Sequence, residues 1–268
     1  MIQNHRAKKS LGQNFLTNSA IIKKIIEVCD LKKDDVVLEI GPGKGAITEG
    51  IASRVKQVLA VEADHTLAKY LHEKFTGTNI TVFSEDILKF DFEKLPDNIK
   101  LISNLPYNIA TPIIEKVIAH RRKFNQFFMM VQLEYGQRMC AVPGNKTYGS
   151  FSCFVQYYGL PEILFKIGRG AFQPMPKVQS CFIKYDLFKK LPQEFHIEER
   201  LFMIIRTAFQ QRRKTILNSL NGFADKASLE KIFVKLGIDS QDRAESLSLG
   251  QYIKIAGELD VICHSANL

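Results

Sequence analysis

The sequence predicts an α/β protein built on a mostly parallel sheet, followed by a small domain made only of helices. Short apolar segments alternate with segments of helical spacing over residues 1–187, and this alternation is typical of a parallel sheet covered by helices on both faces. From residue 188 onward the apolar residues keep helical spacing only. We therefore expect a boundary near residue 188, between a first domain, 1–187, and a second, 188–268.

The predicted strands are short apolar segments followed by turn-forming or polar residues. Five of them cover residues 36–40, 58–61, 80–83, 101–103 and 127–131. Two more, 162–167 and 178–185, are joined by a proline-containing loop and are expected to form an antiparallel edge of the sheet. Helices are predicted at 19–30, 46–53 and 67–75 in the first domain, and at 198–209, 214–220, 229–236 and 249–259 in the second.

Basic residues outnumber acidic ones, with 37 Lys and Arg against 28 Asp and Glu and a formal net charge of +9. This excess favours a polyanionic partner such as a nucleic acid, although a solvated basic surface explains the total charge equally well. Most of the excess lies before residue 188. The clustered residues are more informative than the total, and they are Arg6/Lys8/Lys9, Lys23/Lys24, Arg121/Arg122/Lys123 and Arg212/Arg213/Lys214.

The five cysteines lie far apart in the sequence, and no two of them have the CxxC spacing of a zinc or redox site. The six histidines are also scattered, so we expect no metal. An odd number of isolated cysteines favours a reducing compartment. The sequence has no apolar stretch of the about 18 residues that a membrane span needs. Its polar, basic N-terminus does not resemble a secretory signal, so we expect a cytoplasmic protein.

A glycine-rich turn follows the first predicted strand of the sheet. It reads Glu39-Ile40-Gly41-Pro42-Gly43-Lys44-Gly45-Ala46, and it precedes a predicted helix. Glycines at such a turn let the backbone approach a nucleotide-like ligand closely, and Glu62, at the end of the next strand, is placed to bind ribose hydroxyls. The turn also fits the dinucleotide pattern G-x-G-x-x-G/A. A tight turn without a ligand remains the alternative interpretation.

Polar residues also follow the third and fourth strands. Asp86 ends the third, where its carboxylate could accept a hydrogen bond from an adenine amino group, although for this residue taken alone a helix cap or turn is the better explanation. Asn104-Leu105-Pro106-Tyr107 ends the fourth. An amide oxygen, a backbone carbonyl and an aromatic ring can together bind a planar ring that bears an amino group. We predict that this segment holds the substrate amine.

These segments together resemble the ribosomal RNA adenine N6-dimethyltransferase family, and in particular its small-subunit branch (KsgA/RsmA in bacteria). The resemblance extends over nearly the whole chain. Further segments that carry it are Leu11-Gly12-Gln13-Asn14-Phe15-Leu16, Asn104–Pro112, Tyr148-Gly149-Ser150, Phe172-Gln173-Pro174-Met175-Pro176-Lys177-Val178 and Ala208-Phe209-Gln210-Gln211-Arg212-Arg213-Lys214-Thr215. The chain departs from the family pattern over Gln132–Arg138 and at Gln179, which puts RNA contacts on that face in doubt.

The resemblance implies a Rossmann-like class I methyltransferase fold with S-adenosylmethionine as cofactor. It places Asn14, Leu16, Gly41, Glu62, Asp86 and Asn104 in the cofactor pocket. It places Leu105, Pro106 and Tyr107, with Asn104, around the target base, and Phe172 as a second aromatic residue beside that base. The candidate RNA-binding residues are Arg121, Arg122, Lys123, Arg212, Arg213 and Lys214.

The substrate implied by the resemblance is N6 of two adjacent adenines in the 3′-terminal hairpin loop of small-subunit (16S) rRNA. The partner is then the immature small subunit, modified by a monomeric enzyme that takes part in subunit maturation. Three alternatives remain open. They are a large-subunit rRNA methyltransferase that confers macrolide resistance, a nicotinamide-dependent oxidoreductase that shares the glycine-rich turn, and a non-catalytic RNA-binding assembly factor. The Gln210–Thr215 segment favours the small-subunit branch.

Overall fold

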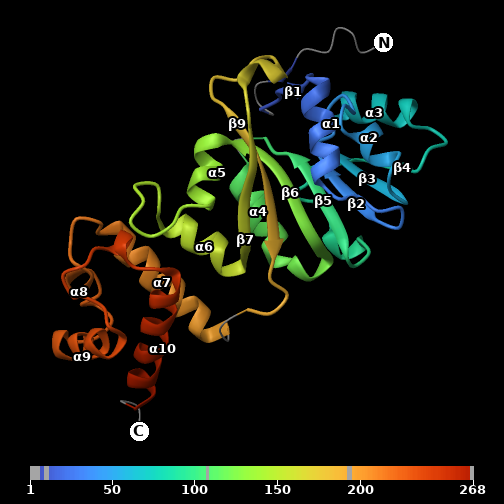
Figure 1. The fold of residues 1–268 in the computed structure, drawn as a ribbon. Helices are drawn as coiled ribbons and strands as arrows, with labels where there is room; N and C mark the ends of the chain where they lie inside the picture. Colours follow the sequence, from blue (N-terminus) through green and yellow to red (C-terminus); the bar gives the residue numbers. More distant parts are fainter. Residues whose placement is uncertain (1–6, 9–11, 107–108, 192–194, 266–268) are drawn as a thin grey trace. The chain divides into compact units, whose positions relative to one another are not determined.

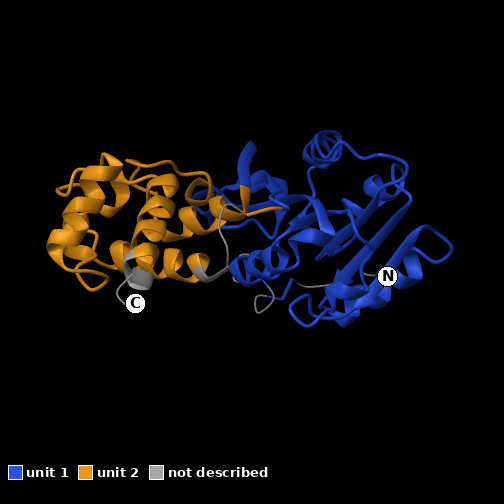
Figure 2. Ribbon diagram, turned by 90° about the horizontal axis from the view of Figure 1, so that it is seen from below, with its two compact units in different colours: residues 1–136, 160–189 blue, residues 137–159, 190–268 orange. Residues whose placement is uncertain are grey.

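The computed structural model describes residues 7–8, 12–106, 109–191 and 195–265. The chain divides into two compact units, shown in Figure 2. Unit 1 comprises residues 1–136 and 160–189, and unit 2 comprises residues 137–159 and 190–268. Residues 137–159, which the predicted boundaries assign to the first domain, thus belong to the second compact unit. Among the described residues, no helix combines the length and the apolar character that crossing a membrane requires.

Unit 1 is built on a seven-stranded sheet in the described part of the chain, with strand order β4-β3-β2-β5-β6-β9-β7 (Figure 1). The pairs from β4 to β6 are parallel, whereas β9 runs antiparallel to β6. The predicted mostly parallel sheet is therefore confirmed. The strands are β2 (Val36–Ile40), β3 (Gln57–Glu62), β4 (Ile80–Ser84), β5 (Ile99–Asn104), β6 (Phe124–Gln132), β7 (Gly159–Ile167) and β9 (Ser180–Leu187).

The strand order reverses at β2, which has β3 on one side and β5 on the other. In open α/β sheets such a reversal opens a crevice at the carboxyl ends of the strands. The central strands are mostly apolar because helices cover both faces of the sheet, with Glu39 in β2 and Lys100 in β5 as buried charged exceptions. The helices and short 3₁₀ turns of unit 1 are α1 (Ser19–Val28), α2 (Thr48–Ala52), α3 (His65–Lys74), η2 (Phe92–Lys94), α4 (Ala110–Ala119), η3 (Arg121–Lys123) and η4 (Arg169–Ala171).

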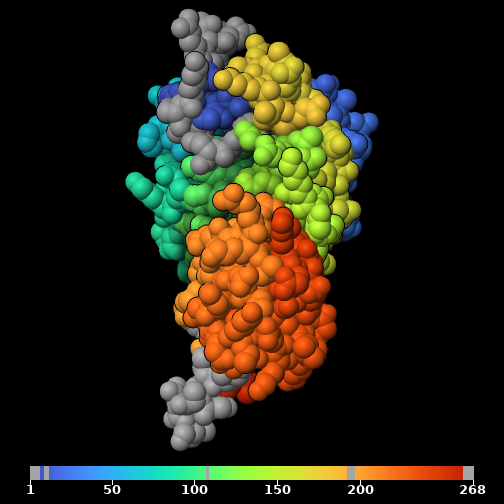
Figure 3. Space-filling view, turned by 90° about the vertical axis from the view of Figure 1, so that its left-hand side faces the viewer, coloured from blue at the N-terminus to red at the C-terminus, as the bar shows by residue number. Residues whose placement is uncertain are grey.

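A second, two-stranded sheet joins the N-terminal segment to the loop before β9, and the sequence did not predict it. β1 (Phe15–Leu16) pairs antiparallel with β8 (Phe172–Gln173), with Leu16 opposite Phe172. The backbone N–H of Thr17 also donates to the carbonyl of Ala171 at 2.8 Å. In Figure 3 the yellow loop region lies at the surface beside the dark-blue N-terminal segment. This pairing fixes the N-terminal segment at the carboxyl edge of the large sheet.

Unit 2 contains the helices α6 (Ser150–Tyr158), α7 (Phe195–Gln210), α8 (Ile216–Ser219), α9 (Lys226–Leu236) and α10 (Leu249–Ser265), with the 3₁₀ turn η5 (Ala244–Ser246). An aromatic cluster joins α6 to α7, because the ring of Phe202 stacks on Tyr158 at 5.9 Å and meets the ring of Phe154 at 5.5 Å. The Tyr158 hydroxyl donates to Glu198 on α7 at 2.5 Å. The predicted run of helices after residue 188 is confirmed.

Gly136 explains part of the unusual segment 132–138. It lies in α5 (Leu133–Met139), which follows β6. A Cβ at this position would lie 2.4 Å from the sulfur of Cys181 and 2.9 Å from Ile183 Cδ1, both on β9. Cys181 is fully buried, so its sulfur occupies the space that a larger residue on α5 would need.

We predict that Gly136→Ala lowers the free energy of unfolding by about 1–3 kcal/mol, as overpacking of a core does. The loss should be smaller when Cys181→Ala is added, because the shorter side chain makes room for the new methyl group. The matched control is Gly257→Ala in α10, where a Cβ meets nothing within 4 Å and the helix should gain stability. Urea unfolding of Gly136→Ala, Cys181→Ala, their double variant and Gly257→Ala measures these effects. Equal losses with and without Cys181 would contradict the packing argument.

Candidate functional site

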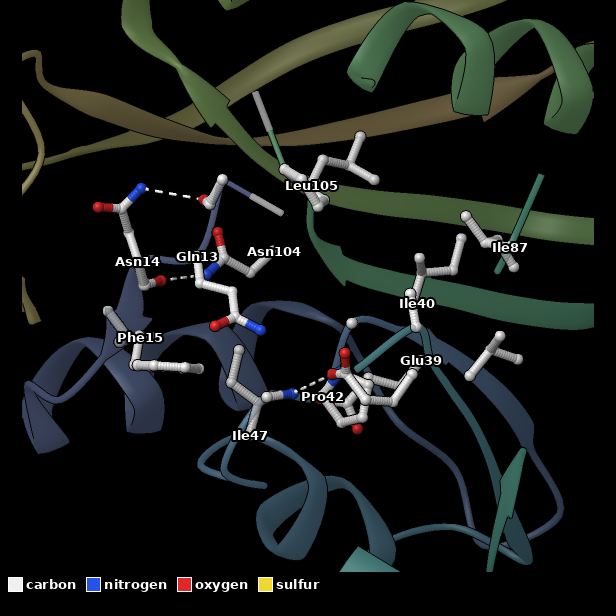
Figure 4. A pocket seen from close by; sticks show the side chains of 18 of the residues that line it. Gln13, Asn14, Phe15, Glu39, Ile40, Pro42, Ile47, Ile87, Asn104 and Leu105 are labelled. Carbon is white, nitrogen blue, oxygen red and sulfur yellow. Dashed lines mark hydrogen bonds between the residues drawn. The ribbon is translucent and has the colours of Figure 1, made fainter. Parts of the chain in front are cut away.

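A cavity of about 490 Å³ lies at the carboxyl ends of β2, β3 and β5 (Figure 4). Its volume falls within the range of about 300–1,000 Å³ that is usual for small-molecule sites. Five segments of unit 1 form the walls, and all six residues predicted to bind the cofactor lie on them. The lining includes Gly12–Thr17, Glu39–Lys44, Val61–Ala63, Asp86–Leu88 and Asn104–Pro106.

The glycine-rich turn forms one wall of the cavity. Gly41 and Gly43 have φ angles of +67° and +62°, in the left-handed region that disfavours side chains. A Cβ on Gly43 would also lie 3.0 Å from the ring of Phe15. Glycine is therefore needed at position 43 both for the backbone turn and for the approach of β1. This double requirement gives the Gly41–Gly45 motif a structural basis.

The Glu62 carboxylate is fixed by two backbone groups. The N–H of Gly43 donates to one oxygen at 3.0 Å, and the N–H of Asp64 donates to the other at 2.9 Å. Burial raises the pKa of Glu62, and these two backbone hydrogen bonds oppose the shift. A carboxylate held in this way retains lone pairs for further hydrogen bonds, so it can accept from the hydroxyls of a ligand.

Glu39 is a site residue for which the sequence analysis assigned no role. Its side chain is 3% exposed, lines the cavity and has one oxygen, Oε2, without a hydrogen-bond partner among the described residues. Burial raises the pKa of Glu39 to about 7; the neighbouring Thr48 hydroxyl opposes this shift, and the charge of Glu62 adds to it. A buried carboxylate without a cation is costly. The only signal in the sequence was a charged residue within the apolar strand β2.

The N-terminal segment is tied to the turn after β3. The ammonium of Lys8 contacts one oxygen of Asp64 at 2.8 Å, and the amide of Gln13 donates to the other at 3.1 Å. Asp64 also accepts from the N–H of Thr66 and so caps α3. Since Asp64 is 1% exposed, these contacts hold residues 12–17 against the cavity. No local pattern in the sequence indicates this role of Asp64.

Asn104 and Leu105 end β5 beside the cavity. The amide nitrogen of Asn104 donates to the carbonyl of Asn14 at 3.1 Å, which leaves the amide oxygen to accept a hydrogen bond from an incoming amine. The N–H of Leu105 donates to Met130 at 3.1 Å and fixes the segment against β6. Pro106 also lines the cavity. Tyr107, the predicted stacking ring, lies outside the described residues.

Comparison with known proteins identifies the family of this chain. The family model for ribosomal RNA adenine dimethylase matches residues 4–260. The chain belongs to this family. It is 38% identical over 253 residues to the ribosomal RNA small subunit methyltransferase A of Clostridium botulinum strain Kyoto, with 92% of each chain covered. It is 39% identical over 261 residues to the protein of that name from Pseudomonas putida KT2440, covering 95% of this chain and 96% of the other.

Two solved structures extend this comparison. A dimethyladenosine transferase from Plasmodium falciparum superimposes with a TM-score of 0.80 at 25% identity, covering 92% of this chain and 98% of that one. The 23S rRNA methyltransferase ErmE superimposes with a TM-score of 0.76 at 26% identity, covering 92% and 100%. The predicted Rossmann-like methyltransferase fold is confirmed.

Phe172 of this dimethylase-family chain lies deeper than its predicted role requires. Its side chain is 4% exposed and belongs to the core cluster with Leu16 and Phe182. It does not line the cavity. Stacking of Phe172 on a target base would therefore require it to leave the core, and this role stays a prediction.

The basic clusters differ in whether their side chains pair with a carboxylate or are exposed to solvent. Lys123 contacts Asp97 at 3.1 Å, whereas Arg122 is exposed. Arg212, Arg213 and Lys214 are all exposed. They lie in the turn between α7 and α8. The next helix begins only after Thr215, which caps it, so the prediction that a helix starts at Lys214 is wrong. Among the described residues, no group of three or more His, Cys, Asp or Glu side chains could hold a metal ion.

We predict that Glu39→Gln stabilises the protein at high pH. The folded-state pKa, about 7, lies above the ordinary 4.5, so the ionised form is disfavoured in the folded state. The resulting penalty grows as pH rises from 4.5 to 7 and reaches about 3 kcal/mol above that. Urea unfolding should therefore show a clear gain for the variant at pH 8 and a small one at pH 5. The exposed Glu73→Gln serves as control; a gain independent of pH would contradict the assignment.

Proposed function

We propose that this protein transfers methyl groups from S-adenosylmethionine to N6 of two adjacent adenines in the 3′-terminal hairpin loop of small-subunit rRNA, giving N6,N6-dimethyladenosines. The observation that carries the proposal is the Asn104 amide, whose nitrogen is tied to Asn14 while its oxygen remains available beside the cavity. Family membership and small-subunit relatives at 38–39% identity support the same substrate.

The residues of the cavity suit this cofactor. When bound, the cofactor supplies a methyl group carried on a sulfonium. Once the methyl group has been transferred, the rest of the cofactor is a neutral thioether. Glu62 is placed to accept hydrogen bonds from ribose hydroxyls, and Asp86 from the adenine amino group. Glu39 supplies a buried carboxylate whose Oε2 has no hydrogen-bond partner among the described residues, and a cationic amino-acid group would neutralise it. Its unpaired oxygen therefore supports a ligand that carries a positive charge.

The target amine needs orientation more than deprotonation. The lone pair of adenine N6 is delocalised into the ring, so N6 is a weak nucleophile. Hydrogen bonds from the amino group to the Asn104 oxygen and the Leu105 carbonyl would align the lone pair with the methyl group and favour a pyramidal nitrogen, and positioning of this kind supplies much of the rate. Stacking on Tyr107 would hold the base after it leaves the RNA stack. After each transfer the methylated, cationic nitrogen releases one proton to solvent, and a second transfer requires room for this nitrogen to rotate.

The two predicted domains would have different roles. Residues 1–187 would carry the cofactor and the chemistry, and the helical part, 188–268, would recognise rRNA. The exposed cations Arg122, Arg213 and Lys214 suit contacts with phosphate. We expect a monomer that acts in the cytoplasm on the immature small subunit.

The observed relatives favour the small subunit over the large one. The curated relatives named for the small subunit are 38–39% identical, whereas the 23S rRNA enzyme is 26% identical. Membership of a methyltransferase family also argues against the nicotinamide-dependent oxidoreductase. A role in subunit assembly is compatible with catalysis.

The decisive test transfers tritiated methyl groups to unmethylated small subunits and identifies the labelled nucleoside.

We predict that Asn104→Ala loses most methyl transfer in single-turnover assays at saturating cofactor while subunit binding persists, because an interaction made mainly in the transition state affects turnover more than affinity. Cofactor affinity can fall as well, since Asn104 lines that cavity. Tyr107→Ala should behave similarly through lost stacking, worth about 1–3 kcal/mol per base, and Tyr107→Phe should be much milder.

The matched control is Asn125→Ala. Asn125 also donates its amide to a backbone carbonyl, that of Asn98 at 2.8 Å, but it does not line the cavity. This variant should methylate at the wild-type rate. If Asn104→Ala does so too, the proposed amine-orienting site is wrong.

We predict that replacing Arg212, Arg213 and Lys214 together by Ala weakens RNA binding and flattens its salt dependence, because fewer counterions are then released from the phosphates. Arg212 also faces Glu245, at 3.6 Å, so it should contribute less than the other two. Cofactor affinity should stay unchanged. The control replaces three isolated exposed lysines, Lys56, Lys69 and Lys94. Equal salt slopes for the two triple variants would identify the cluster as an ordinary solvated surface.

A further inference from the structure

Lys116 on α4 connects two walls of the cavity. Ile113, one turn earlier on the same helix, lines the cavity. The ammonium of Lys116 donates to three backbone carbonyls of the loop after β4, those of Ile87 at 2.9 Å, Leu88 at 2.9 Å and Phe90 at 2.5 Å. An ammonium has three N–H donors, so this loop uses all of them.

The loop held by Lys116 carries the predicted adenine-binding residue. Asp86, Ile87 and Leu88 all line the cavity. One side-chain oxygen of Asp86, Oδ1, accepts from the N–H of Leu88 at 2.9 Å. The backbone carbonyl of Asp86 accepts from the N–H groups of Lys89 and Phe90. The turn therefore points its carbonyls outward, toward a common point that Lys116 occupies.

Electrostatics explains why a cation is needed at this point. Three carbonyl dipoles converge there, and the carboxylates of Asp86, Glu85 and Asp91 lie close enough to act on Lys116. Burial lowers the pKa of Lys116, and these three carboxylates oppose the shift. The ammonium also lies 4.8 Å from the centre of the Phe92 ring, which stabilises a cation. The positive charge of Lys116 thus offsets the mutual repulsion of these carbonyl and carboxylate oxygens.

We propose that Lys116 is a positioning residue for adenine recognition: by gathering the carbonyls of Ile87, Leu88 and Phe90, it holds the Asp86–Leu88 wall in the geometry that selects a 6-amino purine. The proposal rests on the proposed function, since it assumes that the cavity binds an adenine nucleoside. The same helix begins just after the target-amine segment, where the N–H of Ile109 donates to Pro106 at 3.1 Å. Lys116 thus links the adenine wall to the helix that follows the target-amine segment.

The test measures selectivity and not affinity alone. Calorimetry compares the affinities for S-adenosylhomocysteine and S-inosylhomocysteine. In the second compound a carbonyl replaces the 6-amino group that would donate a hydrogen bond to Asp86. The wild type should prefer the adenine compound by at least about tenfold, because a site built to accept from an amino group rejects the analogue that lacks it. Lys116→Met, which keeps the length of the side chain, should lose roughly tenfold in affinity for the adenine compound and most of this preference.

Lys189 provides a matched control. Its ammonium also donates to three backbone carbonyls, those of Arg121, Arg122 and Phe124, and burial likewise lowers its pKa. These partners do not line the cavity. Lys189→Met should therefore lower thermal stability to an extent similar to that of Lys116→Met and leave the preference for adenine intact. If Lys116→Met does not fold, Lys116→Gln replaces it, since its shorter neutral side chain cannot reach three carbonyls.

The outcomes separate the two proposals. A wild type that binds neither compound would refute the proposed cofactor itself. A wild type that prefers the adenine compound, together with a Lys116 variant of unchanged preference, would overturn only the role of Lys116. A parallel loss of affinity for both compounds, with the preference kept, would also overturn it, because that pattern indicates general loosening. Loss of preference in the Lys116 variant alone, and not in Lys189→Met, would support it.

Discussion

The hydrogen bonds from two backbone N–H groups to Glu62 are the interaction on which the rest of the site depends. Gly43 reaches this carboxylate only because the turn after β2 adopts left-handed backbone angles there. Asp64, two residues beyond Glu62, reaches it from the other side and in turn holds Lys8 and Gln13. One buried carboxylate therefore aligns the glycine-rich turn, the end of β3 and the N-terminal segment around a single cavity.

Charge is distributed in opposite senses on the surface and in the cavity. The chain carries a net charge of +9 and exposes basic clusters such as Arg212–Lys214, which suits a polyanionic RNA. The cavity instead is lined by the carboxylates of Glu39, Glu62 and Asp86, with Lys44 as a basic residue of its wall. An acidic cavity in a basic protein suits a cationic cofactor and an anionic macromolecule at the same time. Glu39 contributes a buried carboxylate to this cavity, and its Oε2 has no hydrogen-bond partner among the described residues.

Local patterns in the sequence were sufficient to predict the sheet and most of the cavity. The strand at 36–40 was predicted with the bounds that the structure shows, because a buried parallel strand is a continuous apolar run with a turn signal after it. Contacts between distant segments were not predictable in this way. The pairing of β1 with β8 joins two-residue strands more than 150 positions apart, and two residues carry no periodicity. The roles of the buried Asp64 and the half-buried Lys116 were also missed, since their contacts are with segments distant in the sequence.

The orientation of the Asn104 amide shows how such a distant contact can determine chemistry. An amide can present either its oxygen or its nitrogen to a ligand, and only the oxygen can accept from an amino group. The amide nitrogen of Asn104 donates to the carbonyl of Asn14. The N-terminal segment therefore determines that the oxygen of Asn104 would face the amine. That segment is itself held through Gln13 by Asp64, next to the cofactor-binding turn. In the proposed function, the elements that would enclose the cofactor would thus also set the polarity of the amine site, so cofactor binding and orientation of the target nitrogen would depend on the same contacts.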